Sequence, residues 1–356
     1  MRVVVKVGTS SITDEDGSID LGAVAKVCHE LAAVRADGHE VVLVSSGAIA
    51  AGLPALGMTA RQRPRDARTL QAVSAVGQAR LMAVYGDVFD GMEGQVVPGQ
   101  VLLAPTDFVS RRQYLHARST LTRLLELDVL PIVNENDAVA DDEIRFGDND
   151  RIAALVAQLV GAELLVLLTD AAGVFTSDPR LDDDASLIEE IVRVDAAMES
   201  AAGGTGSNRG SGGMSTKLAA AKIAAWSGVR TVIAAADRPD VIADAIAGEP
   251  GVGTMVRAHT QQLSARKVWI AFAVGSSGRI MVDQGARAAL VERGSSLLAA
   301  GVTGCEGSFD ADDAVEVCGP DGEPFAKGLV RVAAGALRSG DAGLVIHRDD
   351  LVVLPD

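Results

Sequence analysis

Short apolar runs rich in β-branched residues alternate along most of this chain with longer segments whose apolar residues follow helical spacing. Buried strands joined by helices form right-handed crossovers, which place the strands in a mostly parallel sheet with helices on both faces. The sequence therefore predicts an α/β fold, an open sheet sandwiched by helices, up to about His259. The predicted strands are residues 3–7, 41–44, 129–133, 164–168 and 231–235, and the predicted helices are residues 21–34, 115–127, 151–159 and 217–226.

The pattern changes near the glycine-rich residues 251–254 and the polar residues 259–262. Beyond them the apolar segments are short and β-like, and Asp321-Gly322 stands between two of them, which is typical of a hairpin. We therefore expect two domains, an α/β domain over residues 1–258 and a small, mainly β domain over residues 263–356. The strands expected in the second domain are residues 267–274, 279–282, 314–317 and 325–332.

The composition argues against several classes of protein. The 356 residues carry a net charge of −16, which opposes binding to nucleic acid. No uncharged apolar run reaches the roughly 18 residues that a membrane-spanning helix requires. The first residues enter a strand pattern at once, so we expect no signal peptide, and the three cysteines are widely separated and do not suggest a disulfide framework. We expect a soluble cytoplasmic enzyme.

Polar or glycine-rich residues follow four of the predicted strands. In an open parallel sheet ligands bind at the carboxyl ends of the strands, so these four exits predict one binding rim. Gly8 and Gly47 would let backbone N–H groups approach an anion there, although an ordinary turn between a strand and a helix also favours glycine. The residues that follow the strands are 8–11, 45–48, 134–137 and 169–173.

Two lysines are the strongest candidates for binding that anion. Lys6 interrupts an apolar strand beside Gly8. A buried lysine without a partner is costly, so we expect Lys6 at the strand end facing a negative charge; the alternative is an edge lysine that extends into solvent. Lys217 opens a predicted helix after the glycine-rich residues 203–213, an arrangement that suits closure over a polyphosphate better than a flexible linker. It is not a P-loop, because Lys217 follows Thr216.

A second polar cluster precedes the predicted helix at residues 151–159. Asp148, Asn149 and Asp150 together exceed what the capping of one helix requires. They could bind an ammonium group, orient the two lysines or face a magnesium ion. The five histidines show no paired metal-ligand spacing, and the chain has no Gly-x-Ser-x-Gly motif of the serine hydrolases. Further polar groups follow the third strand, namely Asn134, Asn136 and Asp137.

Taken together, these segments resemble the amino acid kinase family. They run in order from Lys6 to Lys217, and the likeness extends across essentially the whole chain. The tail between residues 279 and 334 is similar to a PUA domain. The pair Asn-Glu-Asn-Asp and Gly-Asp-Asn-Asp is more specific than the Lys-x-Gly motif, which the wider family shares. The matching segments are residues 5–10, 45–52, 134–139, 147–150, 168–170 with Gly173 and 178–180, and 212–217.

The resemblance implies an amino acid kinase fold and transfer of the ATP γ-phosphoryl group to the side-chain carboxylate of L-glutamate, on the route to proline. It implies that Lys6 and Lys217 are catalytic, that Asp150 holds them, and that Asp148 helps to place Mg²⁺, which the ATP phosphates mainly carry. The implied ATP contacts are Lys6, Thr169, Asp170, Gly212, Gly213, Met214, Ser215, Thr216 and Lys217. The implied glutamate contacts are Ser46, Asp137 and Asn149, with Asn134 as a further candidate.

The resemblance also implies a homo-oligomer (dimer or tetramer), inhibition by proline and a downstream glutamate-5-semialdehyde dehydrogenase that uses the labile acyl phosphate. Other family members act on N-acetylglutamate or UMP, but Asp137, Asp148 and Asp150 suit a substrate with an ammonium group better. PUA domains commonly bind RNA. In this tail the acidic residues outnumber the basic ones, which argues against RNA because affinity depends mainly on neutralising phosphates.

Overall fold

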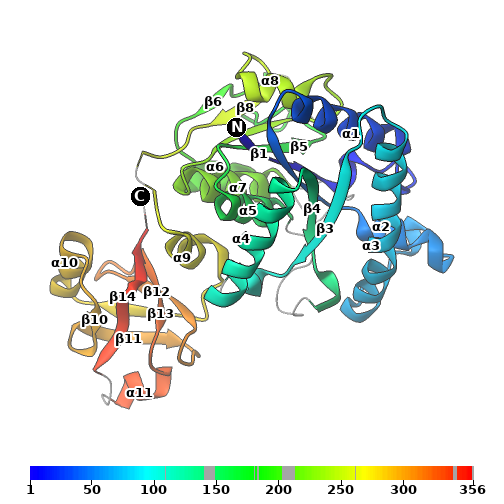
Figure 1. Cartoon of the computed structure of the whole chain (residues 1–356). Helices are drawn as coiled ribbons and strands as arrows, with labels where there is room; N and C mark the ends of the chain where they lie inside the picture. Colours follow the sequence, from blue (N-terminus) through cyan, green and yellow to red (C-terminus); the bar gives the residue numbers. More distant parts are fainter. Residues whose placement is uncertain are drawn as a thin grey trace. The chain divides into compact units, whose positions relative to one another are not determined.

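The computed structural model describes residues 1–108, 110–139, 149–179, 181–182, 184–202, 213–260, 262–339 and 343–354. The chain divides into two compact units, Met1–Gln262 and Leu263–Asp356. Figure 1 shows the elements of both units in colours that follow the sequence. All candidate site residues belong to the first unit.

The first unit is built on an eight-stranded sheet. Neighbouring strands run parallel, except for one antiparallel pair near the edge, β7 with β8. This confirms the predicted mostly parallel sheet. Across the sheet the strands are β3 (Val97–Leu103), β4 (Val129–Glu135), β2 (Glu40–Ser45), β1 (Arg2–Val7), β5 (Leu164–Thr169), β7 (Arg230–Ala235), β8 (Thr254–Val256) and β6 (Glu190–Ile191).

The helices of this unit are α1 (Leu21–Ala36), α2 (Ala48–Gly52), α3 (Ala67–Asp90), α4 (Arg111–Glu126), α5 (Asn149–Val160), α6 (Ala196–Ala202), α7 (Met214–Trp226) and α8 (Val241–Ala247). Short 3-10 turns lie at Thr9–Ser11, Pro54–Leu56, Ala60–Gln62, Pro105–Phe108 and Asp137–Val139. α1, α3 and α8 contribute to one buried core against the sheet, and α5 packs with α7 over the other face (Figure 1). None of the described helices is both long and apolar enough to cross a membrane.

The alternation of side chains along β1 decides where Lys6 points. Successive residues of a strand project to opposite faces of the sheet. Val3, Val5 and Val7 belong to the core that includes α1, so Lys6 projects toward the other face, where α5 contacts β1. Lys6 is the last but one residue of β1 and therefore lies near the carboxyl edge of the sheet.

All five strands and all four helices predicted for this unit are present, with ends that differ by a few residues. The sequence analysis did not predict the strands β3, β6 and β8 or the helices α2, α3, α6 and α8. β3 begins Val97-Pro98-Gly99, and proline and glycine are both depleted in strands, so its pattern does not indicate one. It lies at the edge of the sheet, where a proline that cannot donate a ladder hydrogen bond is tolerated.

The second unit is mainly β, as predicted. Its six-stranded sheet is antiparallel apart from one parallel pair, β9 with β12, and the predicted hairpin around Asp321-Gly322 joins β12 to β13. In order the strands are β10 (Leu297–Leu298), β14 (Leu344–Val353), β13 (Pro324–Val330), β12 (Ala314–Cys318), β9 (Gly278–Val282) and β11 (Val302–Gly307). The helices are α9 (Ala265–Val268), α10 (Gln284–Arg293) and α11 (Ala334–Ser339), with a 3-10 turn at Ala299–Gly301.

One prediction for the second unit is wrong. Residues 267–274 were expected to form a strand, but they belong to α9 and to a π-helical turn at Trp269–Ala273. Val268 and Ile270 are buried there, and the segment packs against β13 and β14 without joining the sheet. A short continuous apolar run fits a buried helix as well as a buried strand, so periodicity alone cannot distinguish the two.

Candidate active site

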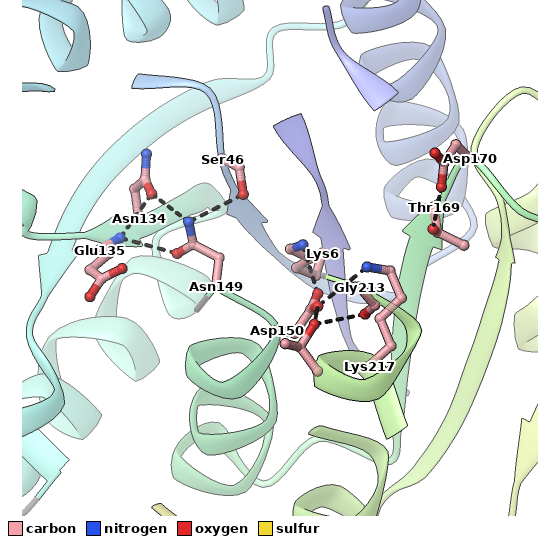
Figure 2. A network of polar contacts seen from close by, with 11 residues as sticks. Lys6, Ser46, Asn134, Glu135, Asn149, Asp150, Thr169, Asp170, Gly213 and Lys217 are labelled. Atoms are coloured by element: carbon pink, nitrogen blue, oxygen red, sulfur yellow. Dashed lines mark hydrogen bonds and ion pairs between the residues drawn. The ribbon is translucent and has the colours of Figure 1, made fainter. Parts of the chain in front are cut away.

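The candidate residues converge at the carboxyl edge of the central strands. β4, β2, β1 and β5 are consecutive neighbours, so residues at their ends are brought to one rim. Figure 2 shows three groups along this rim: an amide cluster, a pair of lysines around one aspartate, and a threonine–aspartate pair. The strand-end residues are Lys6 on β1, Ser46 directly after β2, Asn134 on β4 and Thr169 at the end of β5.

Gly47 makes the turn between β2 and α2. Its φ of 97° lies in the left-handed region, which glycine adopts without steric cost. A Cβ at this position would lie 2.9 Å from Ile12 Cδ1, so a side chain would also be crowded. The turn alone accounts for this glycine, and it leaves Ser46 at the rim.

Lys6 and Lys217 meet on the two oxygens of one carboxylate, that of Asp150. Lys6 Nζ lies 2.6 Å from Asp150 Oδ1, and Lys217 Nζ lies 3.3 Å from Oδ2 (Figure 2). The three side chains are only 6%, 7% and 2% exposed, respectively, so the positive charges are almost fully removed from water. Two cations on one anion leave a local excess of positive charge at the rim.

The electrostatics of Asp150 follow from this geometry. Burial raises the pKa of its carboxyl group, but the positive charges of Lys6 and Lys217 outweigh burial, and the pKa falls to about 2. Thr216 adds a hydrogen bond, with Oγ1 donating to Asp150 Oδ2 at 2.7 Å. Asp150 is therefore ionised at neutral pH and fixes the two ammonium groups in place.

The neighbouring residue, Asn149, organises an uncharged cluster. Its Nδ2 donates to Ser46 Oγ at 3.2 Å and to Asn134 Oδ1 at 3.1 Å, and its Oδ1 accepts from the Glu135 backbone N–H at 3.2 Å (Figure 2). Ser46, Asn134 and Asn149 are all buried. Because Asn149 and Asp150 are consecutive at the start of α5, one helix end connects the amide cluster to the lysines.

Asp137 lies on the turn after β4 and is 7% exposed. Its Oδ2 accepts a hydrogen bond of 2.6 Å from the hydroxyl of Ser74 on α3. Burial raises the pKa of Asp137, while this hydrogen bond and the positive charge of Arg63 act to lower it. A buried carboxylate with no ion pair of its own at short range among the described residues is suited to bind a cationic ligand group.

Thr169 and Asp170 lie apart from the lysines, at the end of β5. Thr169 Oγ1 donates to Asp170 Oδ1 at 3.0 Å. Both residues line a cavity of about 830 Å³ that also includes Ser10 after β1 and Lys26 on α1. The structure brings this pair to the same rim as Lys6, so a single extended ligand would be able to contact both.

The end of the glycine-rich segment forms the start of α7. Gly213 is its N-cap, and its carbonyl accepts from the Lys217 backbone N–H at 3.4 Å and lies 2.8 Å from Thr216 Oγ1, so it shares the proton of that hydroxyl with Asp150 Oδ2. Met214, Ser215 and Thr216 form the first turn of the helix and are half-buried. Two predicted site residues, Gly212 and Asp148, lie outside the described residues.

The sequence analysis missed the residues that support the amide cluster from α3. Gln78 Nε2 donates to the Glu135 carbonyl at 3.3 Å, and Gln78 Oε1 accepts from Asn134 Nδ2 at 3.4 Å and from Gln100 at 3.2 Å. Ser74 contacts Asp137. The available signal was polar residues at i and i+4 on a helix, Ser74 and Gln78, on the side that carries the buried Val73 and Leu81.

Comparisons with known proteins show which proteins this chain resembles. A protein of Pelobacter propionicus named glutamate 5-kinase is 44% identical over 370 residues, covering 99% of this chain and 97% of that protein. A protein of the same name from Burkholderia ambifaria is 44% identical over 368 residues, covering 99% and 98%. A carbamate kinase from Giardia lamblia, solved with AMP-PNP bound, shares the fold with a TM-score of 0.51 at 16% identity, over 72% of this chain and 98% of that one.

Two family profiles divide the chain in the same way as its sheets. The PUA domain profile matches residues 278–350, which lie in the second unit. The profile of the amino acid kinase family matches residues 1–235, which contain the whole rim described above. The first unit and the relatives that match almost end to end lead to one conclusion: the chain belongs to the amino acid kinase family.

Proposed function

We propose that this chain is an ATP-dependent kinase that phosphorylates the side-chain carboxylate of L-glutamate and forms L-glutamyl 5-phosphate, the first step of proline biosynthesis. One observation carries the proposal: two buried ammonium groups share the Asp150 carboxylate directly beside an uncharged amide cluster. The names of the relatives at 43–44% identity support glutamate as the substrate. Catalysis is assigned to residues 1–258, because every proposed site residue lies there.

The chemistry requires charge neutralisation more than proton transfer. The side-chain carboxylate of free glutamate has a pKa of about 4.3, so the nucleophile is already ionised and needs no general base. Its oxygen attacks the γ-phosphorus as the bond to ADP breaks, and the difficulty is to bring two anions together. Lys6 and Lys217 would offset that repulsion and the charge on the phosphoryl oxygens, while Asp150 keeps both lysines in position.

The described residues fit an ATP phosphate chain. Two ammonium groups at one rim supply positive charge for phosphate oxygens, and the first turn of α7 presents backbone N–H groups next to Lys217. We assign Gly213, Met214, Ser215 and Thr216 to phosphate binding, with Gly212 before them. Thr169 and Asp170 line the cavity described above and lie on the β5 side of Lys6, opposite to β2. We assign them to the rest of the nucleotide.

We propose that Mg²⁺ enters the site bound mainly to the ATP phosphates. The described residues hold no cluster of three or more His, Cys, Asp or Glu side chains positioned to bind a metal, and both oxygens of Asp150 already contact lysines. Mg²⁺ commonly keeps several waters and binds through one or two carboxylates together with substrate phosphates. We propose Asp148 as the protein ligand. When bound, Mg²⁺ would neutralise part of the phosphate charge.

We assign the amide cluster and Asp137 to glutamate. The Asp137 carboxylate would pair with the substrate ammonium group, and Ser46, Asn134 and Asn149 would supply uncharged hydrogen bonds to its carboxylates. An acylated amine carries no positive charge, so N-acetylglutamate would leave Asp137 buried without a countercharge. This cost favours free glutamate over N-acetylglutamate.

The decisive experiment is ATP-dependent hydroxamate formation. Hydroxylamine traps an acyl phosphate, so glutamate with ATP, Mg²⁺ and the full-length protein should give γ-glutamyl hydroxamate. ADP release measured across glutamate, N-acetylglutamate, aspartate and UMP should give the highest kcat/KM for glutamate. A higher value for N-acetylglutamate or UMP would overturn the substrate assignment and leave only the kinase fold.

We further propose inhibition by proline, a homo-oligomer (dimer or tetramer) and consumption of the product by a glutamate-5-semialdehyde dehydrogenase. An acyl phosphate hydrolyses readily in water, which supports its rapid use by a second enzyme. We place the enzyme in the cytoplasm, where ATP is abundant and where cysteines stay reduced, in agreement with the free thiols of Cys28, Cys305 and Cys318. Repeating the hydroxamate assay with proline and measuring the mass by light scattering test the first two points.

A further inference from the structure

One side of α3 touches two residues of the proposed glutamate subsite and the backbone between them. Ser74 and Gln78 are four residues apart and therefore lie on the same face of the helix. Ser74 contacts Asp137, and Gln78 contacts Asn134 and the Glu135 carbonyl. Both side chains are buried, at 1% and 8% exposure, so they do not bind solvent in place of these partners.

α3 packs closely on α2, which begins two residues after Ser46. A Cβ on Gly77 would lie 1.7 Å from the carbonyl oxygen of Ala48, and a Cβ on Gly52 would lie 2.2 Å from that of Val73. Two glycines therefore let α2 and α3 approach with backbone against backbone. This packing accompanies the contacts of Ser74 and Gln78 with residues of the subsite.

We propose that Ser74 is a positioning residue of the glutamate subsite, whose hydroxyl fixes the Asp137 carboxylate so that its other oxygen faces the ammonium group of the substrate. The hydrogen bond from Ser74 Oγ to Asp137 Oδ2 is 2.6 Å long and lies between two buried side chains. It occupies one oxygen of the carboxylate and restrains rotation about its Cβ–Cγ bond. This inference rests on the proposed function, because it assigns the other oxygen to an amino-acid ligand.

The same hydrogen bond affects the ionisation of Asp137. Burial raises the pKa of this carboxyl group, and Ser74 and Arg63 lower it. Among the described residues close to Asp137 in the chain, the other charged group is Glu135, two residues earlier. In Ser74→Ala, Arg63 and Glu135 are unchanged and one stabilising donor is lost, so the pKa of Asp137 rises. Substrate binding requires the ionised form, so the KM for glutamate should begin to rise at a higher pH than in the wild type as the pH is lowered.

The test compares Ser74→Ala with wild type and with Thr231→Val. Thr231 is a fully buried residue on β7 whose hydroxyl has no hydrogen-bond partner within the described ranges, so its variant also removes one buried hydroxyl, but at a distance from Asp137 in the sheet order. For Ser74→Ala we expect the KM for glutamate to rise at least about tenfold, as for loss of a hydrogen bond to a charged group. The kcat and the KM for ATP should stay within about threefold, as should all constants of Thr231→Val.

Ser74→Cys keeps the volume of the side chain with a weaker donor, and it carries the same measurement if Ser74→Ala does not fold. A KM for glutamate within twofold of wild type across the pH range would overturn the inference, as would an equal rise in the KM for ATP. If wild type itself forms no hydroxamate from glutamate, the proposed function fails first. An active wild type with an unaffected Ser74 variant contradicts only the inference.

Discussion

The candidate site has two halves that differ in charge: a charged half around Asp150 and an uncharged half around Asn149. Around Asp150, two full positive charges are buried against one negative charge, and the ammonium groups lie within 3.3 Å of its oxygens. Around Asn149, the groups are amides, a hydroxyl and a backbone N–H, and the hydrogen bonds that join them are neutral and 2.8 to 3.4 Å long. Asn149 and Asp150, the central residues of the two halves, are consecutive at the start of α5.

In the proposed reaction, the charged half would act on the rate of phosphoryl transfer and the uncharged half on the binding of glutamate. In the proposed reaction the net positive charge at the Asp150 half would stabilise the charge that spreads in the transition state, so a substitution there should lower kcat. In the proposed site the Asn149 half and Asp137 would bind the groups of glutamate that do not react, so a substitution there should raise the KM for glutamate. Variants in each half should therefore affect different kinetic constants.

Asp150→Asn is expected to have the largest effect. Asn keeps the shape of the side chain but leaves two nearly buried ammonium groups without a carboxylate, and breaking a buried ion pair from one side typically costs about 3–5 kcal/mol. Chemical unfolding of wild type and variant measures the loss. Asp244→Asn, which removes a half-exposed partner of Arg238, should cost less than about 1 kcal/mol. Equal losses of unfolding free energy in the two variants would contradict a larger contribution from the buried ion pairs of Asp150 with Lys6 and Lys217.

The pH dependence of stability sharpens that test. The pKa of Asp150 is about 2 in the folded protein and 3.8 in its ordinary state. A lowered pKa contributes stability that is present above about pH 4 and is lost as the pH falls toward 2. The difference in unfolding free energy between wild type and Asp150→Asn should therefore narrow across that range. A difference that stays constant would show that the charge of Asp150 does not matter.

Lys6→Met and Lys217→Met should each lower kcat by at least about 10²-fold, the loss typical of removing one preorganised electrostatic group. Lys222→Met is the matched control for Lys217, since Lys222 lies on the same helix and pairs with Glu199 at 3.0 Å. Steady-state ADP release measures all three. Near-normal turnover in both lysine variants would remove the charged half from the mechanism.

Asp137→Asn should lower kcat/KM for glutamate at least about tenfold, mainly through KM, because the substrate ammonium group loses its countercharge. The KM for ATP should change little. Asp128→Asn, at a side chain that is 93% exposed, serves as the control for a change of charge. A change in kcat/KM of less than about threefold would mean that Asp137 belongs to another part of the site.

Thr216→Val should have the smallest effect of the set. It removes the 2.7 Å hydrogen bond to Asp150 Oδ2, but both lysines still hold that carboxylate. A neutral donor of this kind contributes about 0.5–1.5 kcal/mol, so kcat should fall by less than about tenfold. A loss as large as that of Lys217→Met would show that the lysines alone do not position Asp150.

Much of the fold could be predicted because its signals are local. The buried strands are continuous β-branched runs, and the helices between them follow a period that a short window reveals. Prediction from local patterns failed where the pattern is weak or fits a helix and a strand equally well. β3 contains proline and glycine, α3 carries Ser74 and Gln78 on its buried side, and residues 267–274 have an apolar pattern that fits either helix or strand.

Local patterns show that Lys6 interrupts a buried strand, that polar groups follow each central strand, and that Lys217 opens a helix after many glycines, and the family resemblance implies that Asp150 holds both lysines. The tertiary structure adds which oxygen of Asp150 each lysine contacts, with Lys217 lying 67 residues further along the chain, and it alone reveals that Ser74 holds Asp137 from α3. The physical reason is that backbone periodicity fixes the direction of a side chain within its own element. The partner it meets depends on how the strands order themselves and how closely the helices pack.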